Sequence, residues 1–138
     1  MDYLLDTSLV SAIIKQDKSV MKKMKERIDK GERFFISVIT DYEILRGLFA
    51  VNAIKKQEIY EILRSQLNVL WIDELELSKK AAEVHVTLKQ RGQIIQDADI
   101  LIAATALVKN LTVITGDSHF SRIETLKVEN WSKKSNSH

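Results

Sequence analysis

Tyr3-Leu4-Leu5-Asp6-Thr7-Ser8, near the start of the chain, places an acid where a short apolar segment ends. Residues 2–6 are expected to form a strand, and Thr7 or Ser8 is expected to cap a helix that continues to Ile14. Three further acids stand at the end of an apolar segment or at the start of a helix: Glu43, Asp99 and Asp117. This shared placement suggests that the four acids serve one site.

Strand and helix signals alternate along the whole chain. The other expected strands are 34–38, 69–72, 112–115 and a short edge strand at 128–131, and the other expected helices are 19–30, 41–51, 53–67, 77–90 and 97–109. Such alternation predicts an α/β fold with a mostly parallel sheet of four to five strands, flanked by helices. We expect one Rossmann-like domain over residues 1–131 and a polar tail over 132–138.

Composition limits the class of protein. At 138 residues with 45% hydrophobic content, the chain suits one domain with a substantial core. The absence of cysteine excludes disulfides and zinc–thiolate sites. No leader peptide and no apolar run of membrane-spanning length is recognisable, so we expect a cytoplasmic protein that does not contact a membrane.

The charge distribution permits a nucleic-acid partner without requiring one. Net charge is +2, a mild bias. The first third of the chain is rich in basic residues, namely Lys15, Lys18, Lys22, Lys23, Lys25, Arg27 and Lys30. This run is typical of a solvated helix face, and the alternative is a rim that faces phosphates.

The four acids predict a metal site. The carboxyl ends of strands in an open α/β sheet converge on one crevice. Carboxylates crowded there repel one another and raise each other's pKa unless a cation lies among them, and oxygen ligands without thiol or imidazole select Mg²⁺ or Mn²⁺. His85, His119 and His138 have no spacing that would bring ligands together, so a histidine metal site is not expected.

Four sequence blocks, in order, resemble the PIN-domain ribonucleases of the VapC toxin type. The blocks are Leu5-Asp6-Thr7-Ser8; Ile36-Ser37-Val38-Ile39-Thr40 with Tyr42-Glu43-Ile44-Leu45-Arg46-Gly47; Asp99-Ile100-Leu101-Ile102-Ala103-Ala104-Thr105-Ala106; and Leu111-Thr112-Val113-Ile114-Thr115-Gly116-Asp117 with His119-Phe120 and Arg122-Ile123. The resemblance implies a PIN-like domain that cleaves tRNA or rRNA with Mg²⁺ or Mn²⁺, with Asp6, Glu43, Asp99 and Asp117 as metal-binding catalytic residues. It also implies a homodimer and a cognate antitoxin. Composition and periodicity alone indicate only an α/β protein with a carboxylate metal site.

Each acid also has a structural interpretation, which for Asp6, at the end of a strand and just before a helix, is a turn or cap residue. Thr40-x-x-Glu43 matches a capping box, in which Glu43 would bind the Thr40 amide. Asp97 and Asp99 both lie near a helix start, and the family motif assigns Asp99 to the metal and Asp97 to the cap. Asp117 follows a glycine in a turn, where aspartate is common.

Two hydroxyl residues and the helices at 41–67 complete the hypotheses. Ser8 and Thr115 are candidates to orient the carboxylates by hydrogen bonds. The helices 41–51 and 53–67 carry more apolar residues than one buried face needs, which suits either core packing or a groove for an antitoxin helix.

Alternative functions are a PIN nuclease of RNA maturation, or a non-catalytic fold that binds Mg²⁺ or a partner. A short neighbouring gene for a DNA-binding antitoxin would favour the toxin.

Overall fold

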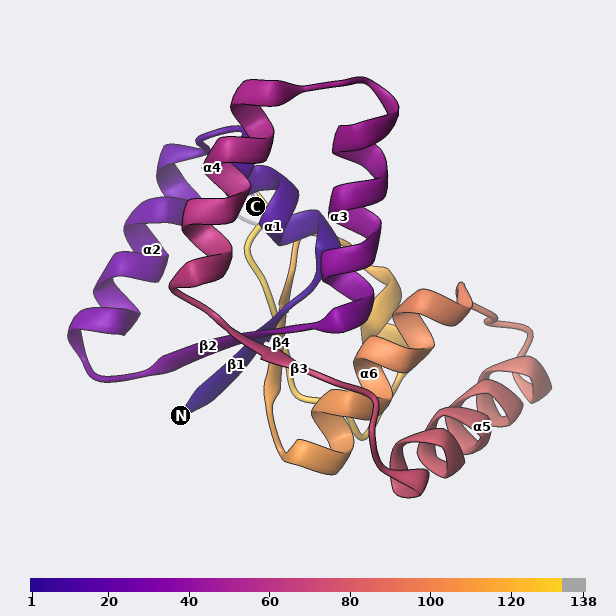
Figure 1. Cartoon of the computed structure of the whole chain (residues 1–138). Helices are drawn as coiled ribbons and strands as arrows, with labels where there is room; N and C mark the ends of the chain where they lie inside the picture. The colour runs from indigo at the N-terminus through magenta and orange to yellow at the C-terminus, as the bar shows by residue number, and fades with distance from the viewer. Residues whose placement is uncertain (133–138) are drawn as a thin grey trace.

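The computed structural model describes residues 1–132, so the predicted polar tail lies almost wholly outside the described residues. The sheet consists of β1 (Asp2–Leu5), β2 (Arg33–Ser37), β3 (Asn68–Leu70), β4 (Thr112–Thr115) and β5 (Val128–Asn130). Its order is β3-β2-β1-β4-β5, and every neighbouring pair is parallel. The predicted α/β fold, its parallel sheet and the edge strand near residue 128 are confirmed (Figure 1).

Helices cover both faces of this sheet. They are α1 (Thr7–Ile14), α2 (Lys18–Asp29), α3 (Val38–Ala50), α4 (Ile54–Ser65), α5 (Leu75–Gln90) and α6 (Asp97–Lys109), with a short 3-10 helix, η1 (His119–Arg122). The helices α1, α2 and α4 lie on one side of the strands, and α5 and α6 on the other (Figure 1).

Alternating side chains along the central strands form the two halves of the core. Leu5 and Ile114 pack with α1, α2 and α4 on one face. Leu4 and Val113 pack with α5 and α6 on the other. Successive side chains of a strand point to opposite faces, so a strand covered on both sides is buried at nearly every position, as β1 and β4 are.

Two of the helix starts that differ from the predicted ones bear on the site. Asp6, rather than Thr7 or Ser8, is the N-cap of α1, because its side chain accepts the amide hydrogen of Leu9. The helix predicted to start near residue 41 starts at Val38, because the Ser37 hydroxyl accepts from the Ile39 amide at 3.0 Å and caps it. The predicted strand 34–38 had extended through this position.

The order of the strands fixes where a ligand would bind. From β1, the chain moves outward on one side through β2 and β3, and then returns to place β4 on the other side of β1. Such a reversal is a topological switch point, where open α/β sheets bind ligands beyond the carboxyl ends of the strands. Asp6 and Asp117 follow β1 and β4 at this point. None of the helices within residues 1–132 has the length and apolar character needed to cross a membrane.

Candidate metal-dependent active site

Asp6 is held rigidly at the end of β1. Its side chain is 3% exposed. Oδ1 accepts from the Leu9 amide at 2.9 Å, and the Ser8 hydroxyl lies 2.8 Å from Oδ1 and 2.9 Å from Oδ2. The Thr115 hydroxyl donates to Oδ2 at 2.5 Å. Ser8 and Thr115 therefore both orient this carboxylate.

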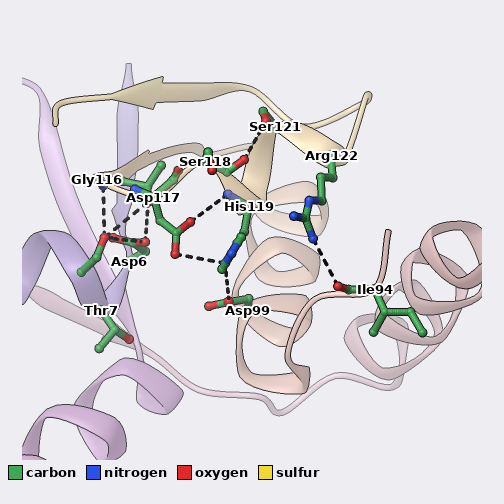
Figure 2. Close-up of polar contacts among 12 residues, drawn as sticks. Asp6, Thr7, Ile94, Asp99, Gly116, Asp117, Ser118, His119, Ser121 and Arg122 are labelled. Carbon is green, nitrogen blue, oxygen red and sulfur yellow. Dashed lines mark hydrogen bonds and ion pairs between the residues drawn. The ribbon is translucent and has the colours of Figure 1, made fainter. Parts of the chain in front are cut away.

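The turn after β4 is tied to the same groups. The Gly116 amide donates to the Ser8 hydroxyl at 3.1 Å, and the Asp117 amide donates to the Thr115 hydroxyl at 2.9 Å. One hydroxyl from the β1 end and one from the β4 end thus join the two turns. Asp117 lies beside Asp6 as a consequence of neighbouring strands, although the two are far apart in sequence (Figure 2).

Glu43 comes from α3 and faces α1. The Thr7 hydroxyl donates to Glu43 Oε1 at 2.6 Å, and it also lies 3.3 Å from the Thr40 hydroxyl. The capping-box interpretation of Thr40 and Glu43 is wrong, because Ser37 is the N-cap and Thr40 is buried inside the helix. Glu43 is therefore free of a capping role, and Thr7 is a site residue that the sequence did not single out.

Asp99 lies in the first turn of α6. The N-cap of α6 is Gln96, without a side-chain hydrogen bond, so Asp97 is the first helical residue and the prediction that it caps the helix is wrong. Asp99 is one turn from Ala103, whose burial lets α6 pack closely on the sheet. The Asp99 carboxylate points into the space between α6 and the turn after β4 (Figure 2).

His119 lies against two of the acids, a contact that the sequence analysis did not predict. Its Nδ1 lies 3.1 Å from Asp117 Oδ2 and 3.9 Å from Asp99 Oδ2. Its backbone amide also donates to Asp117 Oδ1 at 2.9 Å. The sequence signal for this role was its position two residues beyond Asp117, at the same end of the sheet (Figure 2).

The acids influence each other electrostatically. Burial is the main reason that the pKa of Asp6 rises to about 6, hydrogen bonds from Thr115, Leu9 and Ser8 oppose the rise, and the charge of Asp99 adds to it. The pKa of Asp99 is also raised, first by burial and then by Asp117 and Glu43, while His119 acts against this. Keeping these carboxylates ionised without a cation therefore lowers the stability of the folded protein.

Hard divalent cations prefer oxygen ligands, and a bound cation would relieve the repulsion between these carboxylates. The donor set therefore fits Mg²⁺ or Mn²⁺ chemically. Within residues 1–132, no three Asp, Glu or His side chains lie close enough together to enclose an ion as they stand. The side chains would therefore have to converge on a bound ion. Asp6 is fixed, whereas the partly exposed Glu43, Asp99 and Asp117 have more freedom to move.

Comparison with known proteins agrees with this architecture. The PIN domain family matches residues 3–126. The chain is 33% identical to "Ribonuclease VapC2" of Rickettsia felis over 141 residues, covering 96% of this chain and 100% of the relative. It is 30% identical to "Ribonuclease VapC1" of Methanocaldococcus jannaschii over 131 residues, covering 94% and 87%.

Solved structures give the same result. VapBC2 from Rickettsia felis, bound to a DNA fragment from its promoter, superimposes with a TM-score of 0.88 at 28% identity, covering 96% of this chain and 100% of that chain. VapBC-1 from nontypeable Haemophilus influenzae gives a TM-score of 0.81 at 30% identity, covering 95% and 98%. By sequence and by fold, this chain belongs to the PIN-domain family and, within it, to the VapC ribonucleases.

Proposed function

We propose that this chain is a metal-dependent endoribonuclease that acts in the cytoplasm as the toxin of a VapBC-type toxin–antitoxin system. The observation that carries the proposal is the electrostatic coupling of Asp99 with Asp6, Glu43 and Asp117, acids from four segments near the switch point between β1 and β4. The curated relatives of this length are ribonucleases by name.

The four acids would hold one or two Mg²⁺ or Mn²⁺ ions. Such ions make water nucleophilic at neutral pH and neutralise charge that builds up on phosphate oxygens. The hydroxyls of Ser8 and Thr115 keep Asp6 in one orientation. Groups that orient a ligand carboxylate are commonly as important to activity as the ligand itself.

Two further contacts would position the other acids. Thr7 holds Glu43 through a short hydrogen bond of 2.6 Å. His119 holds Asp117 through its ring and its backbone amide. The reaction is hydrolysis of a phosphodiester by water, so the chain needs no protein nucleophile.

The direct test is cleavage of purified RNA by the protein with Mg²⁺, with Mn²⁺ and with EDTA. We expect cleavage only with a metal, and none from Asp6→Asn. Sequencing the 5′ ends of RNA cleaved during brief expression would then identify the RNA and the bond. A wild-type protein that binds Mn²⁺ but cuts no cellular RNA would support the non-catalytic alternative, and a cleavage that only trims precursor ends would support RNA maturation.

A cognate antitoxin is the second part of the proposal. The apolar surplus of α3 and α4 divides by burial. Tyr60 and Leu63 lie in the core, and Leu45 and Leu48 pack against it. Other residues remain more than half exposed, namely Phe49, Val51, Ile54 and Ile62. An exposed apolar face on two adjacent helices suits an amphipathic helix from a partner. The similar structures from Rickettsia felis and Haemophilus influenzae are both VapBC complexes.

The toxin hypothesis predicts growth arrest when the chain is expressed alone, and rescue by a short protein encoded next to it. That protein should copurify with the chain, and Phe49→Glu should release it. The homodimer is part of the same proposal, and light scattering of the free protein tests it. Normal growth on expression of an active, metal-binding protein would contradict the toxin role.

A further inference from the structure

A pocket lined by both apolar and charged side chains adjoins the acidic site. It lies between α1, α3 and α4 and has a volume of about 160 Å³. Thr7 and Glu43 line the end near the acids, Ile14 and Ile44 supply an apolar wall, and Lys15 and Lys56 line it as well. The three helices meet at the upper part of the molecule as drawn (Figure 1).

The two lysine side chains have no partner in the described part of the chain, although Lys15 stands at the C-cap of α1, where a positive charge is favourable. Both are exposed, and neither makes an ion pair or a hydrogen bond with any residue of 1–132. Lys56 lies in the first turn of α4, where a positive charge is unfavourable to the helix. Their charges are therefore available to an anion that lies in the pocket.

Gly47 lines the pocket, although packing within the protein does not require a glycine at this position. It lies inside α3, where glycine is less favourable than alanine. A methyl group added there would meet no atom within 4 Å, so packing within the protein does not require glycine. The open space above Gly47 is therefore room for a ligand.

The size and charges of the pocket identify the ligand. A pocket of about 160 Å³ is smaller than the roughly 300 Å³ minimum of sites that enclose a whole small molecule, so it suits one part of a longer chain. The part of the ligand that lies beside Lys15 and Lys56 must be negatively charged, and the ligand must continue into the site where a phosphodiester would be cut. A single RNA strand has both properties, and basic grooves that track its backbone are common.

We propose that this pocket binds the sugar and phosphate of a nucleotide next to the cleaved bond of single-stranded RNA, with Lys15 and Lys56 contacting the phosphate and Gly47 leaving room for the sugar. The inference rests on the proposed ribonuclease function and deepens it. Thr7 and Ser11 supply hydroxyls along the same wall. The lysines position the strand and do not touch the reacting phosphate.

The test compares two double variants of the full chain. Lys15→Ala/Lys56→Ala removes the pocket charges, and Lys79→Ala/Lys89→Ala removes two exposed charges from α5, on the other side of the sheet. The probe is a fluorescein-labelled single-stranded RNA, measured by anisotropy in EDTA at several salt concentrations. We expect the pocket variant to bind about tenfold more weakly, with a salt slope smaller by about 0.7 for each lost phosphate contact. The control variant should bind with a smaller change in both quantities.

Two further measurements separate the subsite from the ribonuclease function. Gly47→Ala should melt no lower than the wild type but bind the same RNA more weakly, which excludes unfolding as the cause. With Mg²⁺, the pocket variant should raise KM and leave kcat nearly unchanged, since the lysines act on binding. A wild type that cleaves RNA while the pocket variant matches the control would overturn the subsite alone and leave the pocket to a protein partner. A wild type that neither binds nor cleaves RNA would overturn both proposals.

Discussion

Asp6→Asn is expected to stabilise the metal-free protein while it abolishes cleavage. Asp6 is buried, and its pKa rises from 3.8 to about 6. At about 1.4 kcal/mol per pH unit, ionised Asp6 costs the folded state about 3 kcal/mol at neutral pH. Asparagine removes this cost, and it caps helices as well as aspartate does. One hydrogen bond with Thr115 must rearrange, at about 1 kcal/mol, which leaves a net gain of about 2 kcal/mol.

The sign of the pH dependence follows from the raised pKa. Because folded Asp6 binds its proton more tightly than unfolded Asp6, its contribution to stability is complete below pH 3.8 and is lost as pH rises to about 6. Thermal unfolding in EDTA should therefore show Asp6→Asn melting about 8 °C above the wild type at pH 7.5. The difference should shrink when both proteins are compared at pH 4.

Asp17→Asn is the matched control. Asp17 caps α2 by accepting from the Ser19 and Val20 amides, and no other acid is near it in the described hydrogen-bond network. The substitution there should change stability by less than about 0.5 kcal/mol at either pH, because the two residues cap equally well. If Asp6→Asn melted below the wild type in EDTA at pH 7.5, or if the difference did not depend on pH, the electrostatic account of the site would be refuted.

Three more predictions concern the site. Mn²⁺ at millimolar concentration should raise the melting temperature of the wild type, since a ligand of the folded state stabilises it; calorimetry checks this, and an unchanged midpoint would count against a metal site. Asp99→Asn should lower the rate of RNA cleavage by at least about 100-fold, through loss of charge stabilisation at the site. Asp97→Asn should instead lower the free energy of unfolding by about 1 kcal/mol or less. Equal losses of activity for the two variants in a fluorogenic RNA assay would reject this distinction. Thr7→Val should lower kcat about tenfold, because it removes the hydrogen bond that holds Glu43, worth about 1 kcal/mol. Thr7→Ser keeps the hydroxyl and should restore kcat. A Thr7→Val enzyme with full kcat would show that Thr7 does not position Glu43.

The fold was predictable because its signals are local. Apolar runs with helix signals between them specify a parallel sheet, and alternation of side chains within β1 and β4 then separates the core into two halves. Asp6 and Asp117 could be placed at the same edge from their positions after strands. Neither prediction needed knowledge of a contact between distant residues.

The parts of the site that the sequence did not indicate depend on tertiary contacts. The ring of His119 reaches Asp117 and Asp99 only because η1 lies beside the start of α6. The spacing of the three histidines does not signal this contact, and the one available signal was the position of His119 two residues beyond Asp117. Thr7 likewise reaches Glu43 across the boundary between α1 and α3, over a sequence separation of 36 residues.

The start of α3 determines whether Glu43 has a structural or a functional role. If the helix began at residue 41, Thr40 would be its cap and Glu43 would turn back to the free amides of the first turn. Ser37 instead begins the helix at Val38. Each residue turns an α-helix by about 100°, so Glu43 lies beyond the first turn, without an amide to cap, and its carboxylate meets Thr7. One serine hydroxyl, 3.0 Å from the Ile39 amide, thus sets the register of α3 and leaves the Glu43 carboxylate available to the site.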